Sequence, residues 1–166
     1  DKAFISQHVG DVENLETLRF LKSASEHLLR LTNSKPDVIA CDLHPRFTTT
    51  QLAGEWSDEL SVPWVQVQHH HAHAAALMAE HGLDEIIAIV CDGYGYGLGG
   101  EAWGGEILHC DNRGGFRRVG HLEPQPMVGG DLATRYPLRM AAGILSKAIP
   151  LEDWLFAGSR RLPHGS

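Results

Sequence analysis

Apolar positions along the first half of the chain recur at spacings typical of helices and strands in turn. Leucines at every third or fourth position predict an amphipathic helix from about Asn14 to Thr32. Short apolar runs predict strands at residues 3–7, 37–42 and 62–68, with helices at 50–60 and 69–81. Because strands and helices alternate here, we expect a largely parallel sheet with flanking helices.

The pattern changes after Asp84. Apolar runs at 86–91, 101–109 and 116–122 predict three strands joined by turns as an antiparallel meander, followed by a helix from about Asp131 to Lys147. We therefore expect residues 1–84 to form the βαβαβα part of a first lobe and residues 85–150 the βββα start of a second. Residues 151–166 have no apolar period and are expected to be a tail, disordered in part or derived from an expression vector.

Four histidines lie within five positions, where the strand at 62–68 passes into the next helix. If that helix begins near His69, then His69 and His73 stand at positions i and i+4 and share one face. Two imidazoles so placed can hold a metal ion, and a strand–helix junction is a common place for an α/β active site. His70 and His71 are expected to support the pair. The alternative is a solvated histidine patch without a ligand.

A glycine-rich segment, Asp92–Gly97, follows the predicted strand at 86–91 and is expected to be a loop. Glycines let backbone N–H groups approach an anion closely, although a structural hairpin turn has the same composition. With His69 and His73, Asp92 would complete a set of two histidines and a carboxylate, suited to Fe(II) or Zn(II). We predict these three residues as metal ligands and catalytic residues. The residues predicted to contact a bound cofactor are Asp92, Gly93, Gly95, Gly97, Gly104 and Gly105.

Other polar residues are weaker candidates. Glu106 is placed to orient the glycine segment, unless Trp103–Glu106 is only a bulged strand. Asp131 is expected to cap the last helix, and Arg139 to bind an anion or pair with a surface carboxylate. His8, Asp11 and Glu13 are further candidates for a cleft, with Asp11 equally suited to a turn or a helix cap.

Composition and charge indicate which partners and which compartment to expect. The 166 residues carry a formal net charge of -7 with no basic stripe, which disfavours nucleic acid as a direct partner. The three cysteines form no CxxC pair, which favours a reducing compartment and argues against a thiolate zinc site. No apolar run is long enough to span a bilayer, so no membrane contact is expected and the cytoplasm is the expected location.

Six motifs follow one another along the chain: Ser6–Asn14, Cys41–Pro45, Val65–His73, the Asp92 glycine segment, Trp103–Glu106 and Gly129–Asp131. In this order they resemble the HypF-type carbamoyltransferases of [NiFe]-hydrogenase maturation, over roughly residues 3–147. The resemblance implies a fragment of a carbamoyl-transfer domain with the actin-like ATPase (ASKHA) fold, of the kind found in the tRNA threonylcarbamoyladenosine synthase subunit TsaD. The expected fold is therefore α/β, with mixed sheets, flanking helices and two incomplete lobes.

The resemblance also implies an activity. HypF-type enzymes use carbamoyl phosphate and ATP to make carbamoyl adenylate, and they pass the carbamoyl group to the C-terminal cysteine thiol of HypE. That thiocarbamate becomes the cyanide ligand of the hydrogenase. His69 and His73 match a pair that binds a divalent metal contacting nucleotide phosphates in this domain type, and Asp92 matches a residue grouped with the pair.

Much of such an enzyme is expected to lie outside these 166 residues: the acylphosphatase-like domain, the cysteine-rich region that binds zinc, and the domain that forms carbamoyl adenylate. The chain alone is therefore expected to bind nucleotide weakly and to be inactive. Two alternatives remain. The chain could belong to an O-carbamoyltransferase or a tRNA-modifying relative on the same scaffold, or it could be a metal- or nucleotide-binding module without catalysis.

Overall fold

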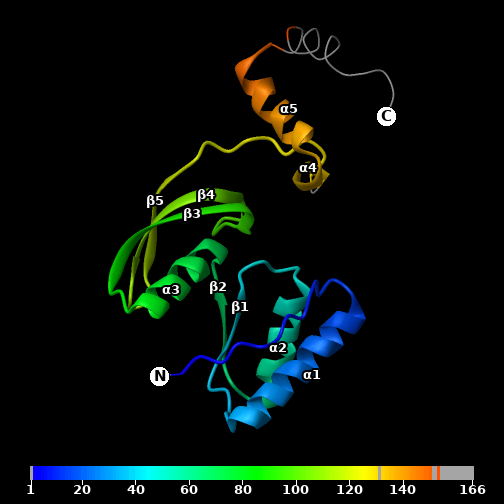
Figure 1. Cartoon of the computed structure of the whole chain (residues 1–166), viewed down its shortest axis with the longest axis vertical. Helices are drawn as coiled ribbons and strands as arrows, with labels where there is room; N and C mark the ends of the chain where they lie inside the picture. Colours follow the sequence, from blue (N-terminus) through cyan, green and yellow to red (C-terminus); the bar gives the residue numbers. More distant parts are fainter. Residues whose placement is uncertain (1, 131, 151–152, 154–166) are drawn as a thin grey trace. The chain divides into compact units, whose positions relative to one another are not determined.

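The computed structural model describes residues 2–130, 132–150 and 153 and has a mixed α/β fold (Figure 1). The chain divides into two compact units between Gly120 and His121, and the candidate site lies wholly in the first. The boundary between these units lies further along the chain than residue 84, and the predicted lobe boundary at that residue stays a prediction.

The first unit begins with two helices and a two-stranded parallel sheet. In chain order these elements are α1 (Leu15–Thr32), β1 (Ile39–Asp42), α2 (Thr48–Leu60) and β2 (Trp64–Val67). Asn14 caps α1, since its side chain accepts a hydrogen bond from the Thr17 N–H at 2.8 Å. Pairing runs from Ile39 opposite Trp64 to Asp42 opposite Val67, with α2 packed on both strands. The parallel arrangement predicted here is confirmed for this pair, and both strands end at the same edge.

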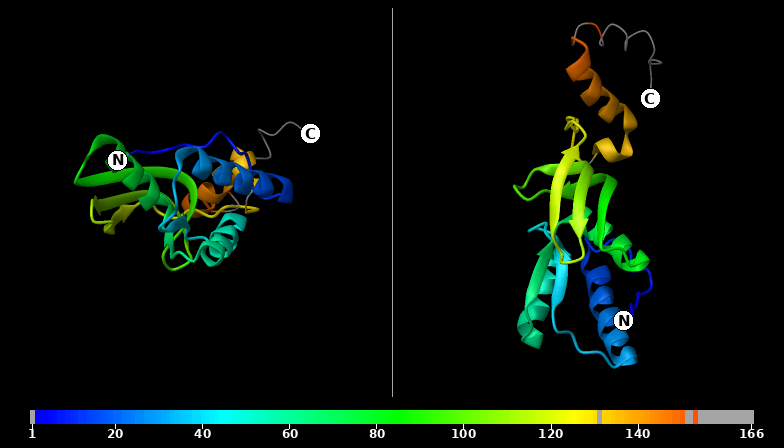
Figure 2. Two further views of the ribbon diagram at one scale, coloured as in Figure 1. Left: turned by 90° about the horizontal axis from the view of Figure 1, so that it is seen from below. Right: turned by 90° about the vertical axis from the view of Figure 1, so that its left-hand side faces the viewer.

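The helix α3 (His69–His81) follows β2 directly and covers one face of an antiparallel sheet (Figures 1 and 2). Gly82 ends α3 in the left-handed conformation, with φ of 63°, where a residue with a side chain would be strained. The sheet has the order β3–β4–β5, with β3 at Glu85–Tyr96, β4 at Ala102–Asp111 and β5 at Phe116–His121. The predicted meander of three strands is therefore confirmed.

The hydrophobic core of the first unit lies between α3 and this sheet. Its buried members are Ala74, Met78, Ala88, Trp103, Leu108 and Cys110. Because small and apolar side chains of α3 pack directly on the sheet, the helix is fixed against β3 and β4. This packing holds the histidine-bearing first turn of α3 close to the far end of β3.

The second unit contains α4 (Leu132–Arg135) and α5 (Pro137–Ala148). Lys147 links α5 to the preceding segment through an ion pair with Glu123, at 2.9 Å, and a hydrogen bond to the Pro124 carbonyl. Pro137 stands in the first turn of α5, where its missing N–H costs no helical hydrogen bond. It divides the single helix predicted at 131–147 into two. Across the described residues, no helix is both long and apolar enough to cross a membrane.

Two predicted elements were wrong. The strand predicted at Ala3–Gln7 does not form within the described residues 2–13, where Ile5 is 92% exposed. An apolar run becomes a strand only when a partner strand takes up its backbone hydrogen bonds. The glycine segment is not an open loop, because β3 continues through it to Tyr96 with an irregularity in register.

Two further predictions fall outside the described residues. These are the helix cap assigned to Asp131 and, apart from residue 153, the tail at 151–166.

Candidate metal centre

Three side chains meet where the first turn of α3 faces β3. One ligand atom from each of His69, His73 and Asp92 lies within 4.8 Å of the others. The Asp92 Oδ2 atom is 2.7 Å from His69 Nε2 and 3.8 Å from His73 Nε2. Two imidazole nitrogens and a carboxylate oxygen form a donor set that suits Fe(II) or Zn(II). The structure thus brings together the three predicted residues, and their role as ligands stays a prediction.

The start of α3 is set by Gln68, which is buried. Its Oε1 accepts the His71 N–H at 2.9 Å, which caps the helix, and its Nε2 donates to the Tyr96 carbonyl at 3.2 Å. A helix that begins at His69 places His69 and His73 on one face, with ring centroids 4.9 Å apart. The Gln68 side chain therefore fixes the residue at which α3 begins, and so places His69 and His73 on one face. It also joins the helix to the end of β3.

The other two histidines of the run point into the packed interior. His70 is fully buried, with Nδ1 3.1 Å from Gln68 Nε2, and its Nε2 has no hydrogen-bond partner among the described residues. The His71 ring stacks on Phe116 at 4.5 Å. Burial lowers the pKa of both imidazoles. They are thus interior residues beside the pair, which is compatible with the predicted supporting role.

Asp42, the last residue of β1, is a contact that the sequence argument missed. Its Oδ2 lies 2.8 Å from His69 Nδ1, on the side of the ring away from Asp92. Burial by itself lowers the pKa of His69, but the hydrogen bond to Asp42 and the charges of Asp42 and Asp92 outweigh burial, so the pKa is raised. The available signal was the position of Asp42 at the end of a strand whose parallel neighbour leads into His69.

A bulge in β3 presents Asp92. The pairing with β4 shifts between Cys91 and Gly95, which leaves Asp92–Tyr94 opposite Gly104. Such a bulge changes the direction in which a strand side chain points. The Gly93 N–H donates to Asp92 Oδ1 at 2.6 Å, so one carboxylate oxygen holds the bulge while the other faces the histidines.

The predicted phosphate-binding glycines serve in packing at three positions. A Cβ at Gly95 would overlap the His70 ring, and one at Gly97 would overlap Trp103. A Cβ at Gly104 would lie 3.2 Å from the Asp92 carbonyl oxygen. These glycines allow close approach of neighbouring groups. Gly93, by contrast, is exposed and has open space where a Cβ would stand, while Gly105 pairs with Cys91 across the sheet.

Glu106 has the contacts that its predicted orienting role requires. Its carboxylate is 2% exposed, accepts the Gly104 N–H at 3.1 Å and pairs with Arg118 through Nε at 2.5 Å and Nη2 at 2.9 Å. Burial raises the pKa of Glu106. The Arg118 hydrogen bonds, the Gly104 N–H and the Arg118 charge outweigh that effect and hold the pKa below its usual range.

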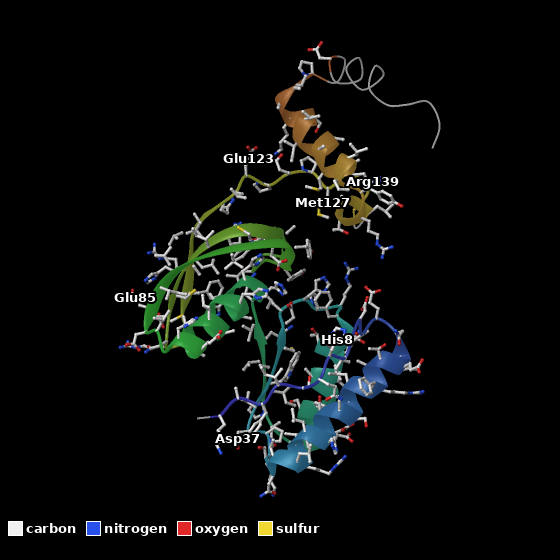
Figure 3. The ribbon with its side chains drawn as sticks, in the orientation of Figure 1. His8, Asp37, Glu85, Glu123, Met127 and Arg139 are labelled. Carbon is white, nitrogen blue, oxygen red and sulfur yellow. The ribbon has the colours of Figure 1, made fainter. Side chains whose placement is uncertain are left out.

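The remaining candidates are not among the three residues whose ligand atoms converge. His8 is exposed in the N-terminal segment, and Arg139 belongs to the second unit, where Nη1 is 3.5 Å from the Val128 carbonyl (Figure 3). Asp11 Oδ1 accepts the Glu13 N–H at 3.1 Å, which is the turn role that the sequence allowed.

The cluster opens into a groove of about 640 Å³ between α3 and β3. Its lining is mostly apolar, with Leu77, Ile87 and Ile89 along its length and His73 and Asp92 among its polar residues. The candidate ligands are therefore accessible from solvent, and the side chains of His69 and Asp92 are each about a third exposed. A small ligand can reach them without displacement of the core.

Comparison with known proteins supplies a family. A sequence-family model described as the HypF Kae1-like domain matches residues 1–80, and a second, described as the carbamoyltransferase Kae1-like domain, second subdomain, matches residues 88–161. A probable carbamoyltransferase HypF of Methanocaldococcus jannaschii is 48% identical over 158 residues, which are 94% of this chain and 20% of the relative. The carbamoyltransferase HypF2 of Cupriavidus necator is 51% identical over 146 residues, which are 87% of this chain and 18% of the relative.

Solved structures agree with these relatives. The crystal structure of T. kodakarensis HypF matches with a TM-score of 0.84 and 41% identity, over 95% of this chain and 21% of that one. Full-length HypF in a phosphate- and nucleotide-bound form matches with a TM-score of 0.76 and 41% identity, over 86% of this chain and 22% of that one. The chain thus spans about a fifth of the length of each of these four proteins.

Proposed function

Since the chain belongs to the HypF family of carbamoyltransferases, we propose that it forms the part of such an enzyme that transfers a carbamoyl group from carbamoyl adenylate to a protein thiol. The adenylate is made from carbamoyl phosphate and ATP elsewhere in the complete enzyme, and the acceptor is the C-terminal cysteine of HypE. The observation that carries this proposal is the convergence of His69, His73 and Asp92 on one point.

The donor set fits a divalent metal. Two neutral imidazoles and a carboxylate supply three ligands, and the exposure of the cluster leaves room for others. A bound Fe(II) or Zn(II) would neutralise the phosphate of the adenylate and polarise the carbamoyl oxygen. The residues that we assign to hold it are His69, His73 and Asp92.

The chemistry requires no nucleophile from this chain. The acceptor thiol sulfur forms a bond to the carbamoyl carbon, the bond from that carbon to the phosphate oxygen breaks, and AMP leaves. The thiol proton is released to solvent. The role of the chain is to bind and orient the phosphate and the carbamoyl group, and such positioning contributes a large share of catalysis.

We assign the phosphate contact mainly to Gly93. Its backbone is exposed at the bulge beside Asp92, and its N–H, which donates to Asp92 Oδ1 in this structure, would exchange that acceptor for a phosphate oxygen. The packing roles of Gly95, Gly97 and Gly104 make direct contact with phosphate less favourable there. Gly105 is retained only as a candidate.

Two finer assignments follow from the same proposal. The two sheets and their helices are parts of an actin-like ATPase fold that the remainder of a full-length HypF would complete. The acceptor thiol must stay reduced, which fits the cytoplasm. The tRNA-modifying alternative is less favoured, because the chain has a net charge of -7 and the curated relatives named above are carbamoyltransferases.

The proposal is tested in a full-length enzyme. The matching segment of the M. jannaschii relative is replaced by this chain, and transfer to a HypE C-terminal peptide is followed by mass spectrometry. We expect transfer by the chimera, and loss of both bound metal and transfer in His69→Ala and His73→Ala. His81→Ala, at the exposed end of the same helix, is the matched control. Undiminished transfer by both site variants would contradict the proposal, and the isolated chain should be inactive.

A further inference from the structure

One carboxylate outside the candidate ligand set is held against it. Asp42 ends β1 and stands opposite Val67 in the parallel sheet, and His69 begins α3 two residues after Val67. The Leu43 N–H donates to the Val67 carbonyl at 2.9 Å, which extends the pairing beyond the strands. The sheet register therefore places Asp42 beside the first residue of the helix, and Oδ2 reaches His69 Nδ1 at 2.8 Å.

The Asp42 side chain is itself fixed. Its Oδ1 accepts the His44 N–H at 2.8 Å, so the carboxylate also closes the turn after β1. The Asp42 carbonyl oxygen accepts the Thr50 hydroxyl of α2 at 3.3 Å, and the side chain is only 19% exposed. The two carboxylate oxygens thus have separate partners, and Oδ2 is directed at the ring by the turn.

An ionised carboxylate can only accept hydrogen bonds, so His69 Nδ1 must carry the proton in this contact. By the same rule His69 Nε2, which is 2.7 Å from Asp92 Oδ2 on the opposite edge of the ring, donates to that carboxylate, so His69 is an imidazolium in this arrangement. Binding of a metal ion at Nε2 would release the Nε2 proton and leave Nδ1–H donating to Asp42. Histidines that ligate metals commonly donate their second ring N–H to a carboxylate, which fixes the ring and increases the basicity of the ligating nitrogen.

We propose that Asp42 is a positioning residue of this site. It holds the His69 ring in one orientation and keeps the proton on Nδ1, so that Nε2 is presented to the metal. The proposal rests on the proposed metal-binding function, and it adds a residue that is not itself a ligand. The proposal also implies that the two histidines differ in how firmly they are held. Both ring nitrogens of His69 contact a carboxylate, whereas the side chain of His73 is 61% exposed. His69 is then the preorganised ligand of the pair.

The test compares the unsubstituted chain with Asp42→Ala, Asp42→Asn and Asp37→Ala. Asp37 is exposed and precedes the other end of β1, so its substitution makes the same change in charge away from the site (Figure 3). Affinity for Zn(II) alone is measured by competition with a chelating dye. Long-range ¹H–¹⁵N NMR of the Zn(II)-saturated chain reports which ring nitrogen of His69 keeps its proton.

We expect the Nδ1–H tautomer of His69 in the Zn(II)-saturated unsubstituted chain, and Zn(II) binding about 10–100-fold weaker in Asp42→Ala. Asp42→Asn keeps an acceptor oxygen, so it should retain the tautomer with a smaller loss of affinity, and Asp37→Ala should match the unsubstituted chain. An Nε2–H tautomer in the Zn(II)-saturated unsubstituted chain, or equal affinities of that chain and Asp42→Ala for Zn(II), would overturn the role of Asp42. Failure of the unsubstituted chain to bind Zn(II) would instead overturn the metal site.

Discussion

The guanidinium carbon of Arg118 lies 4.3 Å from the centroid of the Trp103 ring. From this position on β5, Arg118 reaches the buried Glu106 carboxylate on β4 with two nitrogens. Trp103 is itself 4% exposed, and its indole N–H donates to Glu101 at 2.5 Å. The stacking of Arg118 on Trp103 and its two hydrogen bonds to Glu106 together stabilise the part of β4 that lies against Asp92.

Arg118→Ala should destabilise the chain by about 3–5 kcal/mol, because it leaves the Glu106 carboxylate buried without its charged partner. Arg118→Lys should recover only part of that loss, since lysine cannot form the two parallel hydrogen bonds. Urea unfolding provides the measurement. Arg117→Ala, an exposed arginine one residue earlier on the same strand, is the matched control and should change the stability little. Equal losses from the two alanine variants would contradict this account.

The same pair predicts a dependence of stability on pH. The pKa of Glu106 is held below its usual value of about 4.3, so its contribution is present above that pH and is lost as the pH falls through the lowered pKa. Unfolding free energies measured from pH 7 to pH 3 should fall less steeply in Glu106→Gln than in the unsubstituted chain. The other carboxylates titrate in both proteins and cancel in the comparison. Parallel curves would show that Glu106 carries no lowered pKa.

The sequence predicted what depends on near neighbours in the chain. The helix from Asn14 followed from apolar spacing. The pairing of His69 with His73 followed from their four-residue spacing once the start of the helix was placed. Gly82 marked the end of the same helix. These features are local, so residue order alone determines which side chains share a face.

Contacts set by strand pairing were not predictable in the same way. The approach of Asp42 to His69 requires the parallel register of two strands separated by a helix, and the direction of Asp92 depends on a bulge opposite Gly104. A period-2 pattern does not reveal a bulge, and a glycine-rich composition fits both a loop and a strand. For the same reason Ala3–Gln7 had the pattern of a strand but forms none in the described residues.

Gly95→Ala should both destabilise the chain and disturb the site. A Cβ at this position would overlap the His70 ring and stand 3.1 Å from the Cβ of His69, so the first turn of α3 would have to move. Overpacking of this kind costs about 1–3 kcal/mol. The midpoint temperature of thermal unfolding and the affinity for Zn(II) should both fall. Gly93→Ala, two residues earlier with open space for a Cβ, should leave stability nearly unchanged, and equal effects of the two variants would count against the packing role of Gly95.

Gln68→Ala should release the first turn of α3 from β3. The substitution removes the helix cap on His71 and the hydrogen bond to the Tyr96 carbonyl, and it leaves the buried His70 Nδ1 without its partner. Loss of a cap costs about 0.5–2 kcal/mol, and a buried polar group without a partner about 1–3 kcal/mol. Amide hydrogen exchange at His71 should quicken more than exchange at Met78, because opening of the helix would begin at its capped end.

Gln51→Ala is the control for this change, since Gln51 is an exposed glutamine on α2 and its loss removes neither the cap nor the contact with β3. We expect Gln68→Ala also to weaken Zn(II) binding, because His69 and His73 share a face only while the helix begins at His69. Unchanged Zn(II) affinity with faster exchange at His71 would show that metal binding does not depend on the cap. Unchanged exchange would show that Gln68 does not fix the start of the helix.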